Sequence, residues 1–291
     1  MAGKRSSWLL GCGIGCGVIV LIAVVVIAAG AFFVRDAMHG LGQAVDSGEA
    51  LDQRLGKTSS YTPSVDGSIP AARMEAFLVV RESLEPQRKE IDRTFTEVIP
   101  SAQEARELEA KPFFEKITAV FGIVRSAAGL GPAMGNLLHA RNQALLDAGM
   151  GMGEYTYIYV LAYHSWLGHS PQDGPGEDKI RVRPEGEPIS LRGEGLPSRI
   201  RDELLAILRN QLASFDGEPP ERQAARGPLA AEIAAMESDP DRLPWQDGLP
   251  AATAASLAPY RDRLEAAYSP VTNAFELSRA RRRGSWSIEA D

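Results

Sequence analysis

The residues best suited to chemistry are concentrated in one short segment, Glu154 to Trp166. Its carboxylate and imidazole, Glu154 and His164, are the groups that a general acid and a general base would need. Between and beside them lie aromatic side chains that could contact a ligand: Tyr155, Tyr157, Tyr159, Tyr163 and Trp166. Two interpretations stay open. One is a polar pocket that binds a ligand or moves protons; the other is a structural helix whose polar tips reach buried partners.

The helical spacing of the segment favours the structural interpretation. Two stripes result, the first with Tyr155, Tyr159, Tyr163 and Trp166, the second with Tyr157, Leu161 and His164. A helix that is apolar on both sides is typical of the centre of a bundle. We therefore predict a central helix over 153–167, ended by Gly168.

No recognised catalytic or metal-binding motif accompanies this segment. His164 and His169 are five residues apart, roughly 140° around a helix, so they do not form a metal-binding pair. The glycines of Gly129–Gly135 lack both the spacing and the preceding strand of a dinucleotide-binding loop. The sequence predicts neither a metal nor a cofactor.

The segment Trp8–Val34 has 27 residues and no charged side chain. As a helix it would be about 40 Å long, more than the ~30 Å hydrocarbon core of a bilayer requires. Lys4 and Arg5 precede it, and the sequence that follows has few basic residues near the boundary. The positive-inside rule then predicts a single-pass protein of the plasma (inner) membrane, with residues 1–7 cytoplasmic and the remainder extracytoplasmic.

A cleaved signal peptide is the main alternative to a permanent anchor. Ala29-Gly30-Ala31 has the form of a cleavage site, but the apolar run before it is about twenty residues, longer than the usual 7–15. A lipoprotein signal ending at Cys12 is rejected because only three apolar residues precede the cysteine. A buried core helix would rarely be so long and so uniformly apolar.

Four glycines open the apolar segment: Gly11, Gly13, Gly15 and Gly17. Their spacing gives two overlapping G-x-x-x-G patterns, which allow close helix packing and self-association in lipid. The plainer interpretation is a glycine-rich helix start near the headgroups. Cys12 and Cys16 are either palmitoylation sites or small apolar filler, and no cysteine follows them, so the rest of the chain can form no disulfide.

The remainder of the chain is acidic. After Lys4 and Arg5 are set aside, 29 Lys and Arg face 38 Asp and Glu, a net charge near −9. This balance argues against nucleic-acid binding, which needs clustered positive charge. The expected partners are the lipid bilayer, a second copy through the membrane helix, and an unknown protein or small molecule.

Proline, glycine and capping signals divide the rest of the chain into helices. We predict a juxtamembrane helix and linker over 35–68, a helical domain over 69–277 and a flexible tail over 278–291. Pro86 should kink or split a helix, Gly129–Gly131 should form a turn before a helix that restarts at Pro132, and a single helix should run over 250–267. A small β-hairpin over 179–192 competes there with a mobile insert. The arginines of 279–283 either touch an anionic lipid or polymer or belong to a solvated tail.

Three stretches resemble segments of an uncharacterised group of bacterial membrane-anchored helical proteins. The first is Tyr61-Thr-Pro-x-x-Asp66-Gly67 with the helix that follows to Arg81; the second runs from Gly151 to Gly168; the third is Ser269–Leu277. The resemblance covers most of residues 61–277. It implies a helical fold and no activity.

We therefore expect a mostly α-helical protein, with one N-terminal transmembrane helix and an extracytoplasmic helical bundle. Its expected function is that of a membrane-tethered binding or scaffolding domain. The alternatives are a membrane-anchored enzyme, such as a hydrolase, that uses Glu154 and His164, and an envelope sensor that dimerises through its anchor.

Overall fold

The computed structural model describes residues 40–95, 113–173, 196–283 and 285–289. This part of the chain is mostly helical, which confirms the mostly α-helical part of the predicted fold. The predicted anchor Trp8–Val34, with its four glycines, and the predicted hairpin over 179–192 lie outside the described residues. Among the helices that are described, none combines the length and apolarity needed to cross a bilayer.

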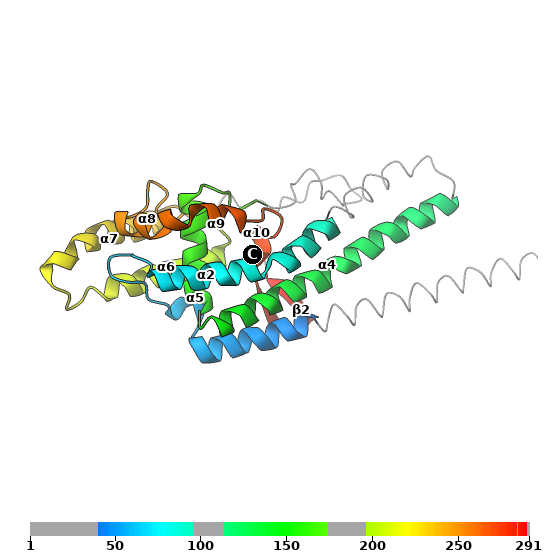
Figure 1. Ribbon diagram of the computed structural model, residues 1–291, viewed down its shortest axis with the longest axis horizontal. Helices are drawn as coiled ribbons and strands as arrows, with labels where there is room; N and C mark the ends of the chain where they lie inside the picture. Colours follow the sequence, from blue (N-terminus) through cyan, green and yellow to red (C-terminus); the bar gives the residue numbers. More distant parts are fainter. Residues whose placement is uncertain (1–39, 96–112, 174–195, 284, 290–291) are drawn as a thin grey trace, which may run out of the picture.

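The helices form an elongated body from which one long helix extends (Figure 1). Two helices without a label cover 40–55 and 85–95. The others are α2 (Ala71–Ser83), α4 (Phe113–Asp147), α5 (Met152–Tyr159), α6 (Ser198–Ala213), α7 (Arg226–Ser238), α8 (Ala251–Leu257), α9 (Arg261–Ala266) and α10 (Asn273–Glu276). Short 3-10 helices are η1 (Thr58–Ser60), η5 (Pro220–Ala225) and η6 (Ala258–Tyr260), while η3 (Val160–Trp166) is a π-helix.

The turn that we predicted at Gly129–Gly131 is wrong, because α4 runs without a break through it and through Pro132. Helix 40–55 lies alongside α4 (Figure 1), and Gly135 of α4 meets it closely. A Cβ added at Gly135 would lie 2.8 Å from the backbone carbon of Gly40 and 2.9 Å from the nitrogen of Leu41. The missing side chain of Gly135 allows the two helix backbones to approach closely, and the glycine does not mark a turn.

Proline positions explain two other helix boundaries. The predicted split at Pro86 is confirmed, since α2 ends at Ser83 and the next helix begins at residue 85 with Pro86 in its first turn. The single helix predicted over 250–267 is instead divided into α8, η6 and α9. Pro259 lies in η6 and has no N–H to continue an α-helical ladder, which accounts for the division.

The C-terminal residues, expected to be a tail, form an antiparallel hairpin in the structure. Strand β1 (Arg279–Arg283) pairs with β2 (Ser285–Glu289), and Arg279 stands opposite Glu289. Arg279 also forms an ion pair with Asp52 of helix 40–55. The polar-apolar alternation Ser-Trp-Ser-Ile in β2 is typical of a strand, although we predicted a tail here.

The main hydrophobic core surrounds α5 and η3. Every residue from Met152 to His164 is buried, so this helix lies at the centre of the bundle, where the two apolar stripes predicted it. A smaller cluster (Leu84, Ile91, Phe95, Ala133 and Leu137) joins helix 85–95 to α4. The aromatic segment is therefore positioned by contacts on all its sides.

Candidate functional site

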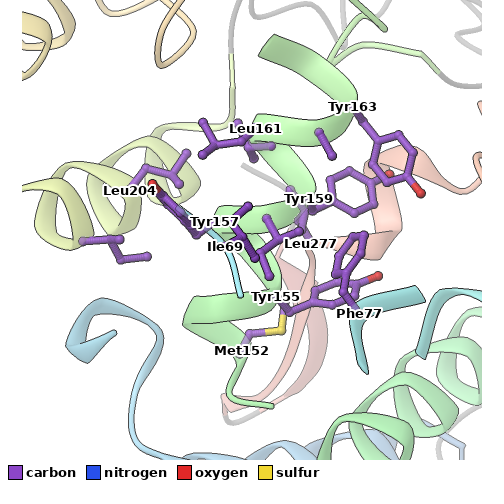
Figure 2. Close-up of a cluster of buried hydrophobic side chains, with 14 of the residues drawn as sticks. Ile69, Phe77, Met152, Tyr155, Tyr157, Tyr159, Leu161, Tyr163, Leu204 and Leu277 are labelled. Carbon is purple, nitrogen blue, oxygen red and sulfur yellow. The ribbon is translucent and has the colours of Figure 1, made fainter. Parts of the chain in front are cut away.

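The central aromatic helix directs its tyrosines to two different sides. In Figure 2, Tyr155, Tyr159 and Tyr163 lie on the side of Phe77 of α2, whereas Tyr157 points the other way, toward Leu204 of α6. The three tyrosines of the first side contact one another in sequence, with ring centroids 5.9 Å apart for 155–159 and 4.7 Å for 159–163. Each side therefore has its own polar surroundings.

On the first side the hydroxyls surround a fully buried ion pair between Arg81 and Glu276. The Tyr155 hydroxyl donates to Glu276 Oε2 at 3.0 Å, and Arg81 Nε donates to the Tyr163 hydroxyl at 3.3 Å. The guanidinium also lies 5.0 Å from the Tyr159 ring centroid. Arg81 and the other groups around the carboxylate lower the pKa of Glu276, although burial opposes this. Glu276 is therefore held ionised inside the core.

Further hydrogen bonds join this network to its neighbours. Arg81 Nη2 donates to the Ala267 carbonyl at 2.6 Å, and Thr272 Oγ1 donates to Glu276 Oε1 at 3.1 Å. Tyr159 donates to Asn273 Oδ1 at 2.8 Å. The tyrosines of this side thus fix α2, α5 and α10 to one another.

The two candidate catalytic residues are not brought together. Glu154 accepts two hydrogen bonds from Arg73 of α2, at 2.7 and 2.6 Å. The ring of His164 is buried and its Nδ1 lies 2.9 Å from the His169 carbonyl. Ten residues separate Glu154 from His164, which is about 15 Å along a helix.

Burial lowers the pKa of His164 to about 4. The imidazole is therefore neutral at pH 7 and its Nδ1 is placed to donate to the carbonyl. This arrangement holds the loop after η3, where Gly168 adopts φ +75° as the expected helix stop. The environment is that of a structural histidine.

Trp166, the last of the candidate ligand residues, lies at the edge of the body. The guanidinium of Arg261 stands 5.2 Å from the centroid of its ring. Trp166 is only partly buried and packs against the main core. Of the five aromatic residues predicted to contact a ligand, Tyr157 differs from the rest because it lines a cavity.

This cavity, here called the Trp245 cavity, has a volume of about 310 Å³. It lies between α6, the start of α7, the loop before α8 and the loop that precedes α2. Its lining is mainly apolar and aromatic, and comprises Val65, Asp66, Gly67, Tyr157, Gln211, Ala225, Pro228, Leu229, Trp245, Gly248, Leu249, Pro250 and Thr253. The size and composition are those of a site for a small ligand.

Tyr157 is a buried residue that lines this cavity. The residue is 2% exposed, and no hydrogen bond joins its hydroxyl to the described residues. Burial, assisted by the nearby Tyr61 and Asp66, raises the pKa of Tyr157. Its hydroxyl is therefore protonated, and it can both donate and accept a hydrogen bond.

Trp245 also lines the cavity, in a strained backbone conformation. Its φ is +57°, and it is the one residue other than glycine with a positive φ in the described chain. Glu232 holds it there by accepting a hydrogen bond from the Trp245 N–H at 2.8 Å, while Arg242 donates twice to the same carboxylate. A bulky residue kept in the left-handed region points to a functional constraint.

Two other cavities carry less chemistry. One lies between helix 40–55, α4 and β1 and includes Arg141, whose donors go to the Glu276 and Ser278 carbonyls and to Asn142. Desolvation lowers the pKa of Arg141 to about 10. The second cavity, beside His139, is more open. No group of three or more His, Cys, Asp or Glu suited to a metal occurs in the described ranges.

Sequence reasoning missed Arg81, Glu276 and Trp245. Arg81 did carry a signal, because it falls among the apolar residues of its predicted helix. No such signal marks Trp245, whose conformation depends on a carboxylate thirteen residues away. No protein family, curated protein or solved structure matches this chain.

Proposed function

We propose that this protein is a membrane-tethered binding domain that takes a small, largely apolar ligand in the Trp245 cavity. The observation that carries the proposal is the strained Trp245 in the lining of a cavity that Tyr157 also lines. The backbone of Trp245 costs folding free energy, since a bulky residue in the left-handed region is strained. The Tyr157 hydroxyl can donate and accept a hydrogen bond and has no such bond to the described residues. A ligand that stacks on the indole and bonds the hydroxyl accounts for both.

Binding is favoured over catalysis by Glu154 and His164, because each already has a separate structural partner. The Arg73–Glu154 pair joins α2 to α5, and His164 orders the loop after η3. Neither lines the Trp245 cavity. Glu154 and His164 therefore stabilise the fold through these contacts.

The binding test uses the full-length protein in detergent and 2-phenylethanol as the probe. Isothermal titration should show saturable binding at one site per chain. Ala225→Trp and Pro228→Trp, which fill the cavity from a partly buried and an exposed position of its lining, should abolish it. Ala213→Trp adds the same bulk on an exposed face of α6 and should bind as the wild type does. Equal heats from all four proteins would show partition into detergent and refute the proposal.

The tether is the second part of the proposal and rests on the uncharged Trp8–Val34 segment. With Cys12 and Cys16 replaced by Ser, no other cysteine is left in the chain, so Ser238→Cys and Ser6→Cys each provide a single reporter, the first on the exposed end of α7. In spheroplasts, a membrane-impermeant maleimide should label Ser238→Cys directly and Ser6→Cys only after lysis. The reverse pattern would invert the orientation, and loss of both proteins in a carbonate wash would remove the tether.

A further inference from the structure

The polar groups of the Trp245 cavity are suited to one kind of ligand charge. Asp66 is its charged residue, and no Lys, Arg or His is among the described residues that line it. The nearest cation on the Trp245 loop, Arg242, lies between two carboxylates, Glu232 at 2.9 Å and Asp247 at 2.7 Å. The cavity itself therefore has a negative potential.

Asp66 is fixed as a carboxylate at the mouth. Its Oδ1 accepts hydrogen bonds from the Ser68 N–H at 3.0 Å and from the Ser68 hydroxyl at 2.7 Å. These bonds lower the pKa of Asp66. The turn that carries it is constrained by Gly67 at φ +73°, where a Cβ would lie 2.9 Å from Thr253 Oγ1. The charge thus has a defined position at the cavity.

The inner wall adds acceptors and π-faces. Gln211 donates its amide N–H to the Ser64 carbonyl at 2.8 Å, and its Oε1 accepts no hydrogen bond within the described chain. Tyr157 and Trp245 present aromatic rings, and indole is the aromatic group that cations prefer. Positive charge is what this set of groups lacks.

We propose that the ligand of the Trp245 cavity is an organic ammonium ion with an apolar body. Its apolar part lies between Tyr157 and Trp245, and its ammonium group faces the Asp66 carboxylate at the mouth. This inference rests on the proposed function and adds the ligand's charge. The acidity of the chain, −7 overall, attracts such cations and repels anions of the same shape.

The test compares three probes of one skeleton on the full-length protein: 2-phenylethylamine, 2-phenylethanol and phenylacetate. At pH 7 and low salt, the protonated amine should bind about tenfold more tightly than the alcohol. Phenylacetate should bind more weakly than either. High salt should reduce the preference for the amine, because it screens the mouth carboxylate.

Asp66→Asn should remove the amine preference and leave alcohol binding intact, since an amide oxygen still accepts the two Ser68 bonds. Asp262→Asn, on an exposed position of α9, makes the same change in net charge and should keep the preference. Equal binding of amine and alcohol would overturn the ammonium assignment while the binding function stands. Failure of all three probes to exceed the Ala225→Trp background would overturn both.

Discussion

Arg81 and Glu276 form an ion pair in which both side chains are completely buried, although they are 195 residues apart in the chain. Arg88 approaches the same carboxylate at 3.7 Å. The pair joins α2, from the start of the domain, to α10, near its end. Its removal should therefore affect the whole fold rather than one surface.

Glu276→Gln should destabilise the protein by about 3–5 kcal/mol, because it leaves the Arg81 guanidinium buried without a counter-charge. Urea denaturation followed by circular dichroism measures the loss. The double variant Arg81→Met/Glu276→Leu should lose less than Glu276→Gln does. Glu85→Gln, which breaks an exposed pair with Lys89, is the control and should leave the midpoint unchanged. A midpoint for Glu276→Gln equal to that of Glu85→Gln would contradict this account.

Stability should fall as the pH drops from 6.5 toward 4. The pKa of His164 is about 4 in the folded chain against an ordinary 6.5, so below pH 6.5 the unfolded chain binds the proton more readily. The contribution is fully present above pH 6.5 and amounts to about 3 kcal/mol once lost. Denaturation midpoints measured from pH 7.5 to 4.5 should show this slope.

His164→Asn is the matched variant for the pH experiment. Its amide can donate to the His169 carbonyl as the imidazole does, yet it does not titrate. Its stability should vary less between pH 6.5 and 4.5 than that of the wild type. Parallel curves for the two proteins would assign the slope to other groups.

Gly153→Ala should destabilise the protein by about 3 kcal/mol through overpacking. An added Cβ would lie 2.2 Å from the Thr58 carbonyl oxygen, where η1 packs against α5. Gly227→Ala is the contrast, because nothing lies within 4 Å of its Cβ position. That helical change should raise stability by about 0.5 kcal/mol. Thermal melts of the two variants should shift in opposite directions, and equal shifts would disprove the predicted contact.

Glu232→Ala should release the Trp245 backbone. The Trp245 amide donates to Glu232 Oε1, so hydrogen exchange at this amide should accelerate by about tenfold or more. Binding of 2-phenylethanol should weaken as the indole leaves its position. Glu237→Ala, on the same helix and paired with exposed Arg209, should change neither. Unaltered exchange in Glu232→Ala would show that other contacts hold the loop.

Local signals in the sequence predicted most of the helices of the described chain. Pro86 and Gly168 act through their own backbone geometry, so their effects can be predicted from the sequence nearby. The two apolar stripes of the aromatic segment likewise indicated its central place. The turn predicted at Gly129–Gly131 failed because α4 is stabilised by a distant partner, helix 40–55.

The Trp245 cavity is formed by contacts between residues far apart in the chain, so the spacing of residues in the sequence could not predict it. Of the aromatic residues named from the sequence, only Tyr157 lines the Trp245 cavity, since the others are engaged on the opposite side or at the edge. Asp66, Gln211 and Trp245 come from three separate segments. Their proximity follows from the packing of the loops around α6, which no local pattern records.

The first helix of the described chain is held along two sides, by α4 through the Gly40–Gly135 contact and by β1 through Asp52 and Arg279. If the protein is tethered as proposed, mechanical load from the bilayer arrives first at this helix. The load is then shared between a segment from the middle of the chain and one from its end. A pulling force on the tether would therefore act in shear on both contacts of helix 40–55, rather than separate this helix from the body by itself.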